Sequence, residues 1–334
     1  MVYKLNQYFK MNSDKIHSTT SLKTAVLFLV FNRPDTTTLV FEKIRQAKPP
    51  RLYVAGDGAR EGRKGEKEKV AKVREIATRV DWPCKVKTFF RDQNVGCKKG
   101  VSTAITWFFE HEKQGIILED DCVPHLDFFT FCEDLLGRYA EDARVSTITG
   151  NNFQHNKWRG NDSYYFSKYN HCWGWATWRR AWEYYQGNIP FWIEWKNSNA
   201  WLKHTPEKIE RRYWQNIFER VQANQVDSWA FPWTASVWYK DGLTATSNVN
   251  LVSNIGFGDD ATHTKSKKNK ISKLPTNNLG KITHPKKVER NIEADVYTFN
   301  NVFKSRKLRF PYSWIIFPYR VLSYIFRNIK IIIK

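Results

Sequence analysis

The sequence has no long hydrophobic run and no cysteine motif. No stretch reaches the roughly 18 apolar residues that a membrane-spanning helix needs, so we expect no such helix. Residues 1–20 are polar and mixed in charge, and they lack the apolar segment of a secretory signal peptide. The five cysteines are odd in number and form no Cys-x-x-Cys pair, which argues against a disulfide framework or a zinc site and indicates a reducing compartment.

Acidic residues are scarce relative to basic ones. The chain has 33 Asp and Glu against 54 Lys and Arg, which gives a formal net charge of +21. Such a surface attracts polyanions: nucleic acid, anionic lipid or phosphorylated ligands. The sequence has no helix-turn-helix signal, no RNP-type strand and no zinc-ligand spacing, so nucleic acid is not an expected partner. A membrane surface and the phosphates of a nucleotide remain as candidates.

Short apolar runs alternate with helical segments over the first 150 residues. The run at residues 25–31 shows no alternation of apolar and polar side chains, which indicates a strand buried on both faces, as in a parallel sheet. The other expected strands cover residues 51–55, 85–90, 115–118 and 144–149, and the expected helices cover 36–47, 61–80, 96–109 and 126–140. This order predicts an α/β fold with a Rossmann-like, mostly parallel sheet flanked by helices.

Tryptophan is concentrated in the second half of the chain. Eleven of the 15 Trp residues lie between Trp173 and Trp238, where helices and irregular loops are expected. These side chains serve either as stacking platforms for ring-shaped ligands such as sugars or as large parts of a core. We interpret this region as the acceptor half of one domain. The chain then divides into an N-terminal extension (1–22), that domain (23–265), a basic loop region (266–307) and a tail (308–334).

The tail at residues 308–334 is aromatic and basic. Arg320, Arg327, Lys330 and Lys334 are spaced by seven, three and four, which places them on one face of an α-helix with apolar side chains opposite. Such an amphipathic, basic C-terminal helix either lies in the interface of an anionic membrane or packs on the domain. The first interpretation predicts a cytoplasmic protein held at the inner face of the cell membrane.

Three acidic residues, Glu119, Asp120 and Asp121, directly follow the apolar strand at 115–118. Their charges repel one another unless a cation or solvent compensates. In open α/β sheets, ligands bind outside the carboxyl ends of the strands. A Mg²⁺ or Mn²⁺ ion held by one or two carboxylates and by substrate phosphates fits this position. The alternative is a solvated turn that leads into an acidic helix N-terminus.

Three further positions follow strands or precede a helix in the first half. Arg33, after the first strand, either contacts a phosphate or base or forms a surface ion pair. Asp57, between two glycines, either accepts hydrogen bonds from a nucleotide or belongs to an ordinary turn. Lys98 lies in a Gly- and Lys-containing segment that can lie against a diphosphate, although the segment is neither a Walker A loop nor Gly-x-Gly-x-x-Gly.

Two candidates lie in the second half. Asp227 precedes a cluster of aromatic residues, where it acts either as a general base in an apolar pocket or as a helix N-cap. His263 ends the glycine-rich segment 254–263 and either completes a metal site or is structural.

Several segments occur in an order that resembles the GT-A fold of nucleotide-sugar glycosyltransferases. The acidic triplet, followed by Pro124 and the Phe128-Phe129 pair, looks most like the N-acetylglucosaminyltransferase I family. The Trp-rich string at 171–178 and the segment 254–263 resemble related bacterial sugar transferases. The resemblance covers roughly residues 23–265.

The resemblance implies roles for the matching positions. Asp121 would coordinate Mn²⁺, and Glu119 and Asp120 would support the ribose and the waters on the metal. Arg33 and Asp57 would contact the nucleotide. For the two positions of the second half, it implies a general base at Asp227 and a late metal ligand at His263.

These expectations describe an inverting glycosyltransferase that uses Mn²⁺ or Mg²⁺. A sugar would pass from a nucleotide-diphosphate donor to a saccharide or lipid-linked acceptor, in the synthesis of a bacterial surface polysaccharide. A sugar-phosphate nucleotidyltransferase is one alternative, although a glycine-rich loop after the first strand is missing. A non-catalytic basic protein that binds a membrane or polyanion is another, but it has no need of the acidic triplet.

Overall fold

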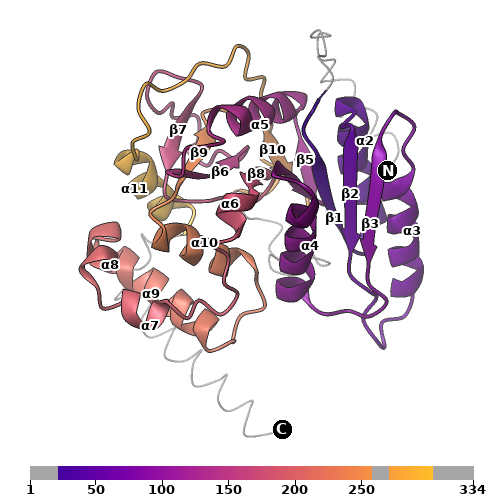
Figure 1. Cartoon of the computed structure of the whole chain (residues 1–334), viewed down its shortest axis with the longest axis horizontal. Coiled ribbons are helices and arrows are strands. Elements are labelled where there is room, and N and C mark those ends of the chain that lie inside the picture. The colour runs from indigo at the N-terminus through magenta and orange to yellow at the C-terminus, as the bar shows by residue number, and fades with distance from the viewer. Residues whose placement is uncertain (1–21, 258–270, 304–334) are drawn as a thin grey trace, which may run out of the picture.

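The structure is a computed structural model that describes residues 22–257 and 271–303, and one sheet runs through both halves of it (Figure 1). The sheet has eight strands in the order β3-β2-β1-β4-β8-β6-β9-β7. Their bounds are β1 Val26–Val30, β2 Arg51–Gly56, β3 Lys85–Phe90, β4 Gln114–Glu119, β6 Val145–Thr149, β7 Tyr164–Ser167, β8 Trp175–Trp178 and β9 Leu243–Ser247. Strands β3, β2, β1 and β4 are parallel neighbours, β8 is antiparallel to β4 and β6, and β7 is antiparallel to β9.

Strand β1 lies inside the sheet and is buried on both faces. Val26, Phe28 and Val30 belong to one hydrophobic core, and Leu27 and Leu29 belong to the other. The first core receives helices α2 (Pro34–Ala47), α3 (Glu66–Thr78) and α5 (Leu126–Arg138), and the second receives α4 (Cys97–His111). The predicted α/β fold with a mostly parallel sheet flanked by helices is therefore confirmed, in an arrangement consistent with the expected GT-A fold.

The tryptophans of the second half form a core. Ten of the eleven indoles between Trp173 and Trp238 are buried, and Trp173 is half-buried. Trp178 belongs to the first core, and the other nine buried indoles belong to the second core. The helices of the second half are α6 Arg179–Trp182, α7 Trp192–Trp195, α8 Asn199–His204, α9 Lys208–Gln222 and α10 Ala230–Tyr239, and all of them contribute to that second core. Most of these side chains are therefore not exposed as stacking platforms for sugars.

Helix α11 (Ile292–Asn301) lies within the region expected to be a basic loop. The side chain of Asn291 caps the helix by accepting a hydrogen bond from the N–H of Ala294. Phe299 packs into the second core, which explains why this segment is helical despite its Lys-rich surroundings. Among the described residues, no helix has the length and apolar character to cross a bilayer. Residues 1–21 of the N-terminal extension, the whole tail (308–334) and His263 lie outside the described residues.

A two-stranded antiparallel ribbon continues from the end of β4. Strand β5 (Cys122–Pro124) pairs with β10 (Val252–Asn254), with Asn254 opposite Cys122. This pairing brings the segment after β10 next to the acidic triplet.

Candidate functional site

A cleft of about 1020 Å³ opens at the carboxyl ends of the parallel strands. Because Leu29 pairs with Glu119 and Val30 pairs with Gly56, the segments that follow β1, β2 and β4 meet at one edge of the sheet. The residues that line the cleft include five of the predicted site residues: Arg33, Asp57, Glu119, Asp120 and Asp227. The structure therefore brings these five side chains together around one cleft.

Arg33 forms a fork with two carboxylates of the triplet. Its Nη2 lies 2.5 Å from Oδ1 of Asp120, and its Nη1 lies 2.8 Å from Oδ2 of Asp121. The backbone N–H of Phe31 donates to the other oxygen of Asp120 at 3.0 Å. Burial lowers the pKa of Arg33, but attraction to Asp120 and Asp121 outweighs it and raises the pKa overall. The guanidinium thus supplies the compensating positive charge that the triplet needs.

Glu119 lines the same cleft and is attracted to Arg33, but it forms no ion pair with that residue. The carboxylate of Glu119 makes no hydrogen bond or ion pair with another described residue. Burial raises the pKa of Glu119, and the charges of Asp121 and Asp120 raise it further. The triplet therefore offers one carboxylate that is free to accept a hydrogen bond from a ligand.

Gly256 is a functional position that sequence reasoning missed. The N–H of Ile255 donates to the backbone oxygen of Asp121 at 2.8 Å, which holds Gly256 against the triplet. A Cβ at Gly256 would overlap the carboxylate of Asp121 and lie 2.7 Å from Nη1 of Arg33. Position 256 must therefore be glycine for Asp121 and Arg33 to keep this arrangement. The glycine-rich segment was visible in the sequence, but the role predicted for it was metal binding by His263.

Two carboxylates hold the loop that begins α4, one from each half of the protein. Asp57 accepts the N–H of Val95 at 3.0 Å, and burial raises its pKa despite that hydrogen bond. Asp227 accepts the N–H groups of Lys98 at 2.8 Å and Cys97 at 3.2 Å. Asp227 therefore caps α4, 130 positions away in the chain, and not α10, whose N-cap is Trp229.

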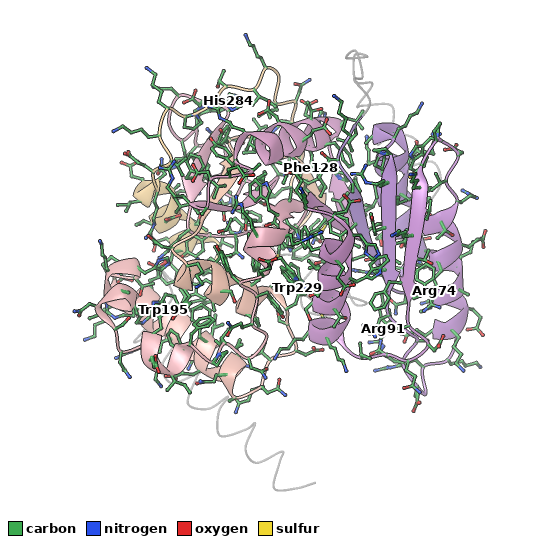
Figure 2. The ribbon with its side chains drawn as sticks, viewed as in Figure 1. Arg74, Arg91, Phe128, Trp195, Trp229 and His284 are labelled. Atoms are coloured by element: carbon green, nitrogen blue, oxygen red, sulfur yellow. The ribbon has the colours of Figure 1, made fainter. Side chains whose placement is uncertain are left out.

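The surroundings of Asp227 differ from the expected apolar pocket. Its side chain is exposed at the cleft. The neighbouring Trp229 and Trp233 are buried in the second core, and Figure 2 shows Trp229 beside α4. Its role as a base stays a prediction.

Lys98 points to a different region from the one expected. Its Nζ lies 3.2 Å from Oδ1 of Asn188 and 3.2 Å from Oδ1 of Asn224, in two loops of the second half. Its backbone N–H contributes to the cap made by Asp227. Its predicted contact with a diphosphate remains a prediction.

Cations packed against aromatic rings also line the cleft. The guanidinium of Arg60 lies 5.4 Å from the ring centre of Phe31 and pairs with Glu66 at 2.5 Å. Arg91, labelled in Figure 2 at the lower end of β3, lies 4.7 Å from the ring centre of Phe89. Flat rings next to cations suit a nucleobase and phosphates. Sequence reasoning did not select these residues, because single Arg and Phe positions in a basic, aromatic chain give no distinct signal.

The triplet fits a divalent cation that binds together with phosphate. No group of three His, Cys, Asp or Glu side chains converges on one point among the described residues. The protein thus offers one or two carboxylate ligands from the triplet, which is the number that Mg²⁺ usually takes when phosphates and waters complete its shell. The oxygens of Asp121 and Asp120 are the suitable donors for such a hard cation.

No protein-family model and no curated protein sequence matches the chain. Among solved structures, the chain is similar to the mannosyltransferase PcManGT from Pyrobaculum calidifontis, solved with GDP-Man and Mn²⁺ (12% identity, 72% of this chain and 74% of that chain, TM-score 0.35). It is also similar to the glycosyltransferase GlyE of Streptococcus pneumoniae (9% identity, 68% and 45%, TM-score 0.30). A third is a cytidylyltransferase from Leptospira borgpetersenii (13% identity, 48% and 63%, TM-score 0.29).

Proposed function

We propose that this chain is a metal-dependent glycosyltransferase that moves a sugar from a nucleotide-diphosphate donor to a saccharide or lipid-linked acceptor with inversion. The observation that carries the proposal is a large cleft at the carboxyl ends of the parallel strands that is lined by Arg33, Glu119 and Asp120, with Asp121 paired to Arg33. Besides these carboxylates, the aromatic residues Phe31 and Phe89 and the cations Arg60 and Arg91 line the cleft, which suits a nucleobase, a diphosphate and a metal ion.

The predicted site residues have different roles in this transfer. Bound Mn²⁺ or Mg²⁺ supplies Lewis-acid neutralisation of the leaving diphosphate. Asp121 and Asp120 would hold the cation and its waters, Glu119 would support the ribose, and Arg33 and Asp57 would orient the nucleotide. Asp227, on the side of the second half, takes the proton of the acceptor hydroxyl as that oxygen forms its bond to the anomeric carbon and the bond from this carbon to the diphosphate oxygen breaks.

The nucleotidyltransferase alternative is less well supported. Strand β1 ends at Val30 and α2 begins at Pro34, so only three residues separate them. This connection leaves no room for a glycine-rich loop around a triphosphate. The pairing of Arg33 with the triplet also gives a defined site that a non-catalytic basic adaptor does not require.

Binding of the donor is tested by thermal shift. The purified chain is heated with each of a panel of nucleotide-sugars, with Mn²⁺ or with EDTA. One nucleotide-sugar is expected to raise the melting temperature in Mn²⁺ well above the sum of the shifts from metal and ligand alone. If no nucleotide-sugar shifts the melting temperature in either condition, the proposal is wrong.

Asp227→Asn is expected to lower kcat by about 10²-fold or more, because an amide cannot accept a proton from the acceptor. The side-chain oxygen of Asn can still accept the N–H of Lys98, whereas the hydrogen bond from Cys97 is lost, so a small fall in the melting temperature is expected beside the kinetic effect. Steady-state kinetics with a fixed donor measure the change. An unchanged kcat would leave Asp227 with the capping role alone and the base unassigned.

The tail is proposed to hold the protein on an anionic membrane surface, as a peripheral protein at the inner face of the cell membrane. Deletion of residues 308–334 is expected to abolish sedimentation with anionic vesicles at low salt, because each basic residue near such a surface contributes about 1 kcal/mol. The full chain should sediment at low salt and be released at high salt. Equal sedimentation of the truncated and full chains would refute the anchor.

A further inference from the structure

The guanidinium of Arg33 occupies the carboxylate oxygens that a divalent cation needs. It bonds one oxygen of Asp120 and one of Asp121, at 2.5 and 2.8 Å. The second oxygen of Asp120 accepts the N–H of Phe31, and the second oxygen of Asp121 lies 3.3 Å from Sγ of Cys122. Every oxygen of the two carboxylates therefore already has a protein partner.

These carboxylates cannot turn aside to receive a cation independently of Arg33. Asp120 and Asp121 are 2% and 8% exposed, and Gly256 packs directly against the carboxylate of Asp121. A divalent cation on these oxygens would lie next to the guanidinium, and the two positive charges would repel in a poorly solvated site. Arg33, whose side chain is 24% exposed, is the group that has an open side toward the cleft and can move.

An Arg33 side chain released from the triplet needs another anion. The nearby carboxylate of Glu66 is already paired with Arg60 and also accepts a hydrogen bond from Asn32. A diphosphate in the cleft is a suitable partner, because the planar guanidinium matches two phosphate oxygens as well as it matches a carboxylate.

We infer that Arg33 couples the two ligands of this site: it competes with the cation for Asp120 and Asp121, and it transfers to the diphosphate when both ligands bind. This inference rests on the proposed function. It makes the cation bind weakly alone and tightly in the presence of a diphosphate, so that the protein selects the metal–nucleotide pair over either component.

The coupling predicts that loss of the positive charge of Arg33 increases the affinity for Mn²⁺. Arg33→Gln is expected to bind Mn²⁺ alone at least about tenfold more tightly than the unmodified chain, because the competing cation is gone. The same variant is expected to bind a nucleoside diphosphate in EDTA more weakly. Arg33→Lys keeps a positive charge and is expected to bind Mn²⁺ alone nearly as weakly as the unmodified chain.

The experiment is an electron paramagnetic resonance titration of free Mn²⁺ with the unmodified chain, Arg33→Gln, Arg33→Lys and Arg51→Gln, each with and without UDP, GDP or CDP. Arg51→Gln is the matched control, since it removes a two-point pair between an Arg and the carboxylate of Glu112 that does not line the cleft. Its Kd for Mn²⁺ is expected to stay within about threefold of the unmodified value.

The outcomes separate the inference from the proposed function. Tighter binding of Mn²⁺ by Arg33→Gln in the absence of nucleotide supports the inference. A lower melting temperature of Arg33→Gln in EDTA that Mn²⁺ restores to the unmodified value also supports it. If the unmodified chain binds Mn²⁺ with a nucleoside diphosphate but Arg33→Gln binds Mn²⁺ alone no more tightly, the inference is wrong and the proposed function stands. If no protein binds Mn²⁺ under any condition, both are wrong.

Discussion

Asp121→Asn is expected to lower kcat by at least about 10³-fold, because a neutral amide cannot share the charge of a divalent cation at the leaving diphosphate. The side-chain oxygen of Asn still accepts the hydrogen bond that Nη1 of Arg33 donates at 2.8 Å. Asp120 continues to pair with Arg33, so the melting temperature should stay close to that of the unmodified chain. Steady-state kinetics in Mn²⁺ and a thermal scan in EDTA measure the two effects.

Asp35→Asn is the matched control for Asp121→Asn. Asp35 lines the same cleft, is exposed and follows Pro34 in the first turn of α2. Its substitution removes the same charge from the cleft without touching the triplet, and kcat is expected to change little. Near-normal Mn²⁺-dependent turnover by Asp121→Asn would show that the metal is not held at Asp121.

Gly256→Ala is expected to lower kcat by about 10²-fold, because a displacement of about 1 Å in a positioning group can cost that much. The added methyl group overlaps the carboxylate of Asp121, a short side chain that cannot move away without losing Arg33. Residue 256 has no left-handed backbone angle, so alanine is compatible with its backbone and the effect is steric. Kinetics and Mn²⁺ titration of the variant measure the loss.

The control for Gly256→Ala is Gly137→Ala. A Cβ at Gly137 meets no atom within 4 Å, and the residue lies in α5. Alanine there is expected to stabilise the protein by up to about 1 kcal/mol and to leave kinetics unchanged. If Gly256→Ala behaved like this control, the close contact between Gly256 and the triplet would not matter for function.

The strands and the acidic triplet were predictable because their signals are local. The run at 25–31 is apolar at every position, and β1 is buried on both faces. The triplet follows an apolar strand, and the carboxyl ends of parallel strands meet at one edge. Helix α3 begins at Glu66, five residues later than expected, because Gly62 and Gly65 adopt left-handed turns before it.

The contacts within the site could not be read from the sequence, because they join segments that are far apart in the chain. Asp227 caps α4 across 130 positions, and no local pattern distinguishes that role from a cap on α10 or a base. The importance of Gly256 depends on the pairing of β5 with β10, which a glycine-rich turn alone does not reveal. The number of Trp residues did not show whether they stack on a sugar or belong to a core, since both kinds of Trp look identical in sequence.

The most direct test of the account is to identify the product of donor turnover. The unmodified chain and Asp121→Asn are incubated with each nucleotide-sugar in Mn²⁺ or EDTA, either with a mixture of saccharide acceptors, with pyrophosphate, or with neither, and the nucleotide released is identified. The account predicts that one donor yields its nucleoside diphosphate, only in the presence of a divalent cation, and that Asp121→Asn releases almost none. Formation of a nucleoside triphosphate from nucleotide-sugar and pyrophosphate, or equal turnover in EDTA, would contradict it.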